Sequence, residues 1–221
     1  MFPKGMTRKK LVGSVLHALG MTALVFMGKA ASAGIHKNPN DHRELQSFKL
    51  TNDLSVLLIS DPKADKAAAA MNIAVGSNAD PEGRQGLAHF LEHMLFLGTQ
   101  KYPEAGAYKT FIQSHGGKLN AYTAHENTNY YFEVLASSLE GALDIFAQFF
   151  IEPLFTEGST ERELNAIQSE HDKNVQSDIW RRFQMLKNET EEGSTFCKFS
   201  TGNNDTLIEE PKKSGWGELA D

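Results

Sequence analysis

The sequence is poor in cysteine, with only Cys197 among its 221 residues. One thiol cannot form an internal disulfide, which excludes the small secreted domains that disulfides hold together. An excess of positive charge is also missing, because 22 Lys and Arg stand against 28 Asp and Glu. The hydrophobic content of 40 % is ordinary for a globular protein, so wholesale disorder is not expected.

The apolar run in the first 33 residues is short, which favours a cleaved secretory signal over the alternative, an uncleaved membrane anchor. Lys4, Arg8 and two further lysines precede "LVGSVLHALGMTALVFMG", which His17 and three glycines interrupt. The small residues "ASA" (31–33) follow, as at a signal-peptide cleavage site. We therefore expect residues 1–33 to be a cleaved secretory signal and residues 34–221 to be the mature chain. Export without disulfides favours a bacterial periplasm, with secretion as the alternative.

Removal of residues 1–33 makes the chain more acidic. That segment holds five Lys or Arg and no acidic residue, so the charge changes from −6 to 17 minus 28, or −11. A surface of this sign repels nucleic acid and anionic membranes. We expect neither a nucleic-acid partner nor a stable membrane association after signal cleavage.

The order of predicted elements indicates an α+β fold. Residues 55–60 and 69–76 are strand-like, and residues 118–136 predict two strands around a short polar turn. Helices are expected from about 103 to the Gly116–Gly117 stop, from 137 to about 153, and from 160 to about 188. We predict helices layered on a largely antiparallel sheet, with no clear element after residue 193.

The stretch "GLAHFLEHMLFLGT" (86–99) predicts a helix that is apolar on most sides yet carries three ionisable groups. At about 100° per residue, His93 lies near 40° and Glu92 near −60° from His89, so all three share one face. Two imidazoles one turn apart can bind a single Zn²⁺, and the carboxylate beside them can act as a general base. The alternative is two ordinary histidines and a solvated Glu, but unpaired ionisable groups on an apolar helix are costly.

A catalytic zinc usually has three protein ligands, so a remote third ligand is expected. Glu163 and Glu170 lie seven residues apart on one face of the predicted helix 160–188, beside its apolar stripe. Glu163 could instead cap that helix as the partner of Thr160. Spacing alone does not choose between the two carboxylates.

Three motifs together resemble the pitrilysin and insulin-degrading-enzyme family of zinc metallopeptidases, the inverzincins. They are "GLAHFLEHMLFLGT", "NAYTAHENTNYYFEV" and "ERELNAIQSEHDKNVQSDIWRRFQ", with a weaker continuation in "KFSTGNNDTL". The resemblance covers about residues 45–208. It implies one zinc per chain bound by His89, His93 and Glu170, with Glu92 as the general base. Glu163 matches a carboxylate that orients a ligand without contacting the metal.

The resemblance also implies a peptide substrate and hydrolysis of its peptide bonds. Asn120 and Ala121 match a sheet edge that takes the peptide as an extra strand. An internal strand is the alternative, because sequence does not reveal which strand lies at an edge.

Members of this family are much longer than this chain, so we expect an N-terminal fragment or truncated gene product. Missing C-terminal domains, or a complementing chain, would then be further partners. The expected activity is that of an exported zinc metalloendopeptidase. The alternatives are a non-catalytic chain that binds zinc or peptide and a remnant that does not fold stably.

Overall fold

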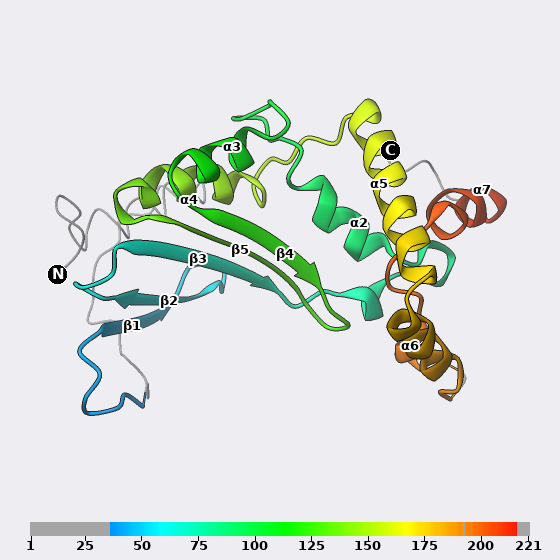
Figure 1. The fold of residues 1–221 in the computed structure, drawn as a ribbon, viewed down its shortest axis with the longest axis horizontal. Coiled ribbons are helices and arrows are strands. Elements are labelled where there is room, and N and C mark those ends of the chain that lie inside the picture. The colour runs from blue at the N-terminus through cyan, green and yellow to red at the C-terminus, as the bar shows by residue number, and fades with distance from the viewer. Residues whose placement is uncertain (1–35, 192, 216–221) are drawn as a thin grey trace.

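A computed structural model describes residues 36–191 and 193–215 (Figure 1). The expected signal segment 1–33 lies outside the described residues. The strands are β1 (Glu44–Lys49), β2 (Ser55–Ser60), β3 (Lys66–Ile73), β4 (Lys118–Thr123) and β5 (Thr128–Leu135). The α-helices are α2 (Leu87–Met94), α3 (Ala107–Ser114), α4 (Leu139–Gln148), α5 (Glu157–Val175), α6 (Asp178–Asn188) and α7 (Glu210–Lys213).

The central sheet has the strand order β3-β5-β4, and both pairings are antiparallel. Strand β5 alternates between the two faces, so that Tyr130, Phe132 and Val134 are buried while Tyr131 and Leu135 are exposed. Helices α3 and α4 cover the buried face (Figure 1). A separate antiparallel hairpin is formed by β1 and β2. The predicted α+β class with a largely antiparallel sheet is confirmed.

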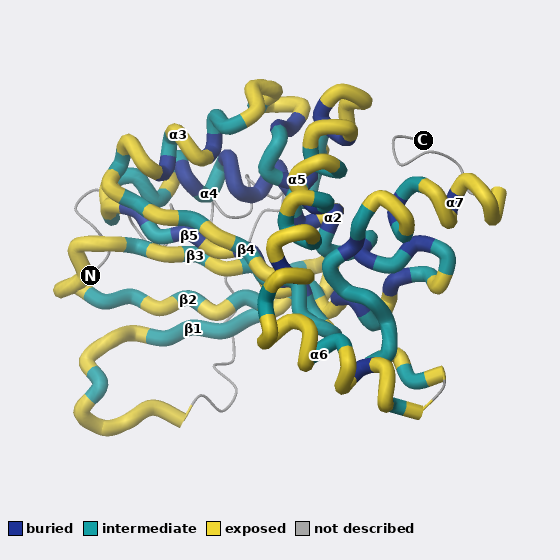
Figure 2. Tube along the Cα trace, turned by 45° about the vertical axis from the view of Figure 1, so that its right-hand side comes forward, coloured by how far each residue is buried: buried dark blue, intermediate teal, exposed yellow. Residues whose placement is uncertain are grey.

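Aromatic side chains fill the core between the sheet and its two covering helices. Tyr108 and Ile112 of α3 meet Phe146 of α4 and Phe132 of β5, and all four are buried. Ring contacts link Tyr108 to both Phe132 and Phe146, with centroids 6.1 Å apart in each pair. Burial of each such side chain stabilises the fold by about 1.5–3 kcal/mol. The dark tube of α4 in Figure 2 marks this buried layer.

The prediction of one helix over residues 160–188 is wrong. Helix α5 begins earlier, at Glu157, and ends at Val175, while α6 begins at Asp178 after Ser177, whose ψ of 121° is not helical. Serine followed by aspartate is typical of the start of a helix, and α6 begins there. The regular spacing of apolar residues on both sides of the break led to the prediction of a single helix. The apolar stripe predicted along this helix is also wrong beyond the break, since Ile179, which the spacing places on the stripe, is 77 % exposed.

The end of the described chain returns to α2, although no clear element was expected after residue 193. A π-helical turn, Asp205–Glu209, leads into α7. Leu207 on that turn is buried in a second cluster with Phe90 and Met94 of α2 and Ile167 of α5. Figure 1 shows α2, α5 and this segment grouped beside one end of the sheet. Within residues 36–191 and 193–215, no helix is long and apolar enough to cross a membrane.

Candidate metal centre

Helix α2 begins at a buried carboxylate. Asp80 accepts hydrogen bonds from the backbone N–H groups of Gly86 and Ala88, at 2.7 and 2.9 Å. Gly86 adopts φ 93°, a left-handed conformation that glycine takes without strain. Burial raises the pKa of Asp80, and the two N–H donors oppose that rise. The negative group at the helix N-terminus fixes where α2 starts and therefore which way its side chains face.

The apolar side of α2 packs against α5. Phe90 and Met94 contact Ile167, which is fully buried. On the adjoining side of α2, His89 and His93 face the carboxylates of the same helix, Glu163 and Glu170 of α5.

Three side chains from these two helices converge. One ligand atom each from His89, His93 and Glu170 lies within 4.8 Å of the others. The Oε2 atom of Glu170 is 3.7 Å from Nε2 of His89 and 3.9 Å from Nε2 of His93. These separations are too long for hydrogen bonds. They approach the ~3.4 Å that separates two ligand atoms around a tetrahedral zinc ion, so the donor set and spacing fit such an ion.

The other nitrogen of each imidazole is anchored. His93 Nδ1 lies 3.1 Å from Oε2 of Glu163, and His89 Nδ1 lies 2.7 Å from the backbone oxygen of Thr201. Both acceptors favour a proton on Nδ1, which leaves each Nε2 lone pair directed towards Glu170. The anchors thus hold both rings in the tautomer that a metal requires.

Glu92 points to the same side of α2 and is 8 % exposed. Its Oε2 accepts a hydrogen bond of 2.6 Å from the Thr123 hydroxyl at the end of β4. Burial raises the pKa of nearby Tyr130, and the Glu92 carboxylate adds to that rise. The carboxylate is therefore held in a partly dry environment beside the His-His-Glu cluster.

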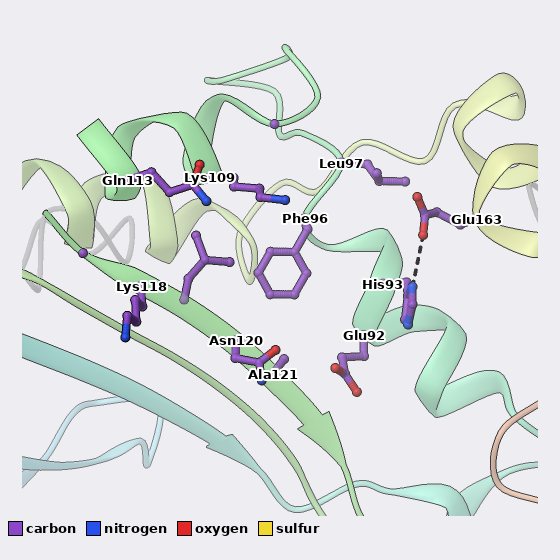
Figure 3. A pocket seen from close by; sticks show the side chains of 13 residues that line it. Glu92, His93, Phe96, Leu97, Lys109, Gln113, Lys118, Asn120, Ala121 and Glu163 are labelled. Carbon is purple, nitrogen blue, oxygen red and sulfur yellow. Dashed lines mark hydrogen bonds and ion pairs between the residues drawn. The ribbon is translucent and has the colours of Figure 1, made fainter. Parts of the chain in front are cut away.

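A pocket of about 610 Å³ opens next to this cluster. In Figure 3, Glu92 and His93 border it from α2, and the dashed line joins His93 to Glu163. The opposite side is formed by β4, including Asn120 and Ala121. Strand β4 pairs with β5 on one side only, so it is an edge strand of the described sheet.

The structure brings every site residue named from the sequence to this region. His89, His93 and Glu170 converge, Glu163 contacts His93 rather than capping α5, and Asn120 and Ala121 line the adjoining pocket. The roles of these residues in binding and catalysis stay predictions.

Sequence reasoning missed three supporting residues, Asp80, Thr123 and Thr201. The Thr201 contact uses a main-chain oxygen 112 residues from His89, which no side-chain pattern could have revealed. Asp80 precedes α2 by a few residues, so a search for a carboxylate at the helix N-terminus could have found it.

Comparison with known proteins shows which family this chain is similar to. The family model described as insulinase (peptidase family M16) matches residues 55–194. Human insulin-degrading enzyme is 51 % identical over 181 residues, which cover 82 % of this chain and 18 % of the enzyme. The Schizosaccharomyces pombe protein mug138, whose name contains the words zinc protease, is 52 % identical over 178 residues, covering 80 % of this chain and 18 % of that protein.

A solved structure extends the agreement to the fold. The crystal structure of pitrilysin superposes with a TM-score of 0.77 at 40 % identity, covering 81 % of this chain and 19 % of pitrilysin. The chain thus spans about a fifth of the length of these relatives. A sequence and a fold that both match across most of the chain place this protein in the insulinase family, peptidase family M16.

Proposed function

We propose that this chain carries the zinc site and the general base of a metalloendopeptidase. The observation that supports this most directly is the convergence of His89, His93 and Glu170 beside the buried Glu92. Two imidazoles, each anchored through Nδ1, and one carboxylate form a typical set of ligands for catalytic zinc.

The residues around the site have distinct roles in this proposal. His89, His93 and Glu170 would hold one zinc ion, which when bound supplies a Lewis acid for the scissile carbonyl. Glu163 would keep the His93 ring oriented through the Nδ1 contact. Glu92, fixed by Thr123, would accept a proton from the attacking water and pass it to the leaving amine.

The peptide substrate would lie along β4. An edge strand offers unpaired main-chain groups to an extended peptide, and the 610 Å³ pocket beside Asn120 and Ala121 offers room for a side chain. Main-chain pairing would supply affinity for many sequences, while the pocket would select among them.

The test combines metal analysis with a peptidase assay on the purified chain and its Glu92→Gln variant. Zinc should be present in both proteins at about one per chain, and hydrolysis of a fluorogenic peptide should fall by about 10²–10⁴-fold in the variant. A chelator should abolish the hydrolysis, and added zinc should restore it. Cleavage that persists in Glu92→Gln would refute the assigned base.

A non-catalytic zinc- or peptide-binding chain is the second candidate, because the chain spans only 18 % of the human relative. Further domains or a complementing chain would then be needed for hydrolysis. Bound zinc without hydrolysis that depends on Glu92 would favour this candidate.

We also propose export to a bacterial periplasm, with secretion as the alternative, on the basis of residues 1–33. Fractionation of cells expressing the tagged chain, with N-terminal sequencing, tests the proposal. A mature N-terminus near residue 34 would support export.

A further inference from the structure

Residues 198–203 cross the start of α2 and carry the oxygen that orients His89. This segment forms no regular helix or strand. It nevertheless lies very close to α2, since a Cβ atom added to Gly86 would be 2.2 Å from the Cα of Gly202. Because the segment has no regular hydrogen-bonded structure of its own, contacts with other parts of the protein must hold the Thr201 carbonyl beside His89.

The first of these contacts comes from Lys187 of α6, which is only 1 % exposed. Its Nζ donates to the backbone oxygen of Lys198 at 2.8 Å and to the Ser200 hydroxyl at 3.2 Å. The rings of Phe183 and Phe196 lie 5.2 and 5.9 Å from Nζ. Burial lowers the pKa of Lys187, and no ion pair to it is found among residues 36–191 and 193–215. A buried ammonium is costly, so its two hydrogen bonds to one segment are a strong constraint on that segment.

The second contact comes from Lys198 itself. Its Nζ donates to the backbone oxygens of Asn78 and Asp80, at 2.8 and 2.5 Å. Asp80 is the residue whose carboxylate accepts the first N–H groups of α2. Lys198 therefore ties the segment to the same residue that determines where the metal-binding helix begins.

We propose that Lys187 and Lys198 are positioning residues of the metal centre. Together they fix the Thr201 oxygen against His89 Nδ1, and this contact holds His89 Nε2 ready for the metal. The inference rests on the proposed zinc site. It extends that site to two lysines that contact neither the three ligands nor the base in the structure.

The test measures zinc affinity by competition with a chromophoric chelator. Lys187→Met and Lys198→Met remove the ammonium groups but keep apolar side-chain length. Lys173→Met, at an exposed position on α5, is the matched control. The zinc Kd should rise about tenfold in each test variant, at the lower end of the effect of losing an outer partner of a ligand. The control should stay within about twofold of wild type.

A second readout separates positioning from general stability. The visible absorption bands of the Co²⁺-substituted protein report the geometry of the ligands and should change in both test variants. Lys198→Arg keeps the donors and should restore both the bands and the zinc Kd. If Lys187→Met fails to fold, Ser200→Ala removes only one acceptor of Lys187 and should weaken zinc binding about threefold.

Unchanged zinc affinity and cobalt bands in folded variants, including Ser200→Ala, would overturn the inference, even with a lowered Tm. That result would assign the lysines to the fold alone and would leave the zinc site intact. A wild-type chain that binds no zinc would instead refute the proposed function, and this inference with it.

Discussion

Removal of the Glu163 carboxylate should weaken metal binding although Glu163 is not a proposed ligand. Its Oε2 lies 3.1 Å from His93 Nδ1, and the two side chains are only 20 % and 26 % exposed. This partial burial limits screening of the contact by water. Without the acceptor, nothing holds the Nδ1 proton in place, and the His93 ring can rotate or change tautomer before it binds the metal.

The size of the effect follows from the strength of the contact. A hydrogen bond to a charged group contributes about 1.5–3 kcal/mol, which corresponds to about 10- to 100-fold in affinity. Glu163→Ala should reach the upper part of that range. Glu163→Gln keeps an oxygen acceptor but loses the charge, so its zinc Kd should rise about tenfold.

The assay is a zinc titration against a chromophoric chelator, with far-ultraviolet circular dichroism to verify the fold. Glu161→Gln is the matched control, because Glu161 is exposed two residues away on α5. A Glu163→Ala protein that folds and binds zinc as tightly as wild type would show that the His93 contact does not support the metal.

Three further changes address other parts of the site. Thr123→Val removes the 2.6 Å hydrogen bond to Glu92, so kcat/KM should fall about tenfold while the zinc Kd stays within about twofold. If zinc binding weakens in parallel, Thr123 does not act through Glu92 alone. Gly86→Ala places a Cβ within 2.2 Å of the Gly202 Cα. The free energy of unfolding in urea should therefore fall by about 1–3 kcal/mol or more. An unchanged denaturation midpoint would mean that residues 198–203 can move away at little cost. Lys109 lines the pocket from α3 (Figure 3). Lys109→Glu should therefore reduce kcat/KM about fivefold more for a peptide that contains Glu than for the same peptide with Gln. An equal reduction for both peptides would show that Lys109 does not select substrates.

The sequence by itself determined the elements whose pattern is local. The strand at residues 55–60 has the predicted bounds, and the two strands within 118–136 are present with their turn. Two other element boundaries differ from the predicted ones. The helix expected from about residue 103 begins at Ala107, because Gly106 takes φ 87° immediately before it. Strand β3 begins at Lys66 rather than 69, since pairing with β5 extends to Leu135.

The sequence also placed His89, Glu92 and His93 on one face, because helical spacing fixes their relative angles. It left Glu163 and Glu170 as alternatives for the third ligand until the family resemblance indicated Glu170. Both are accessible from one side of α5, and only the packing of α2 on α5 through Ile167 determines which carboxylate meets both Nε2 atoms.

Only the tertiary structure decided which distant groups support that face. Thr201 and Lys187 lie 112 and 98 positions from His89. Thr201 contributes a main-chain oxygen to His89, and Lys187 donates to the main-chain oxygen of Lys198; every residue possesses such an oxygen. Hydrophobic periodicity predicts which side of a helix is apolar. It cannot predict which backbone carbonyl a distant segment places against that helix. The local sequence pattern thus determined which ionisable side chains α2 presents on one face, while long-range packing determined which contacts orient those side chains.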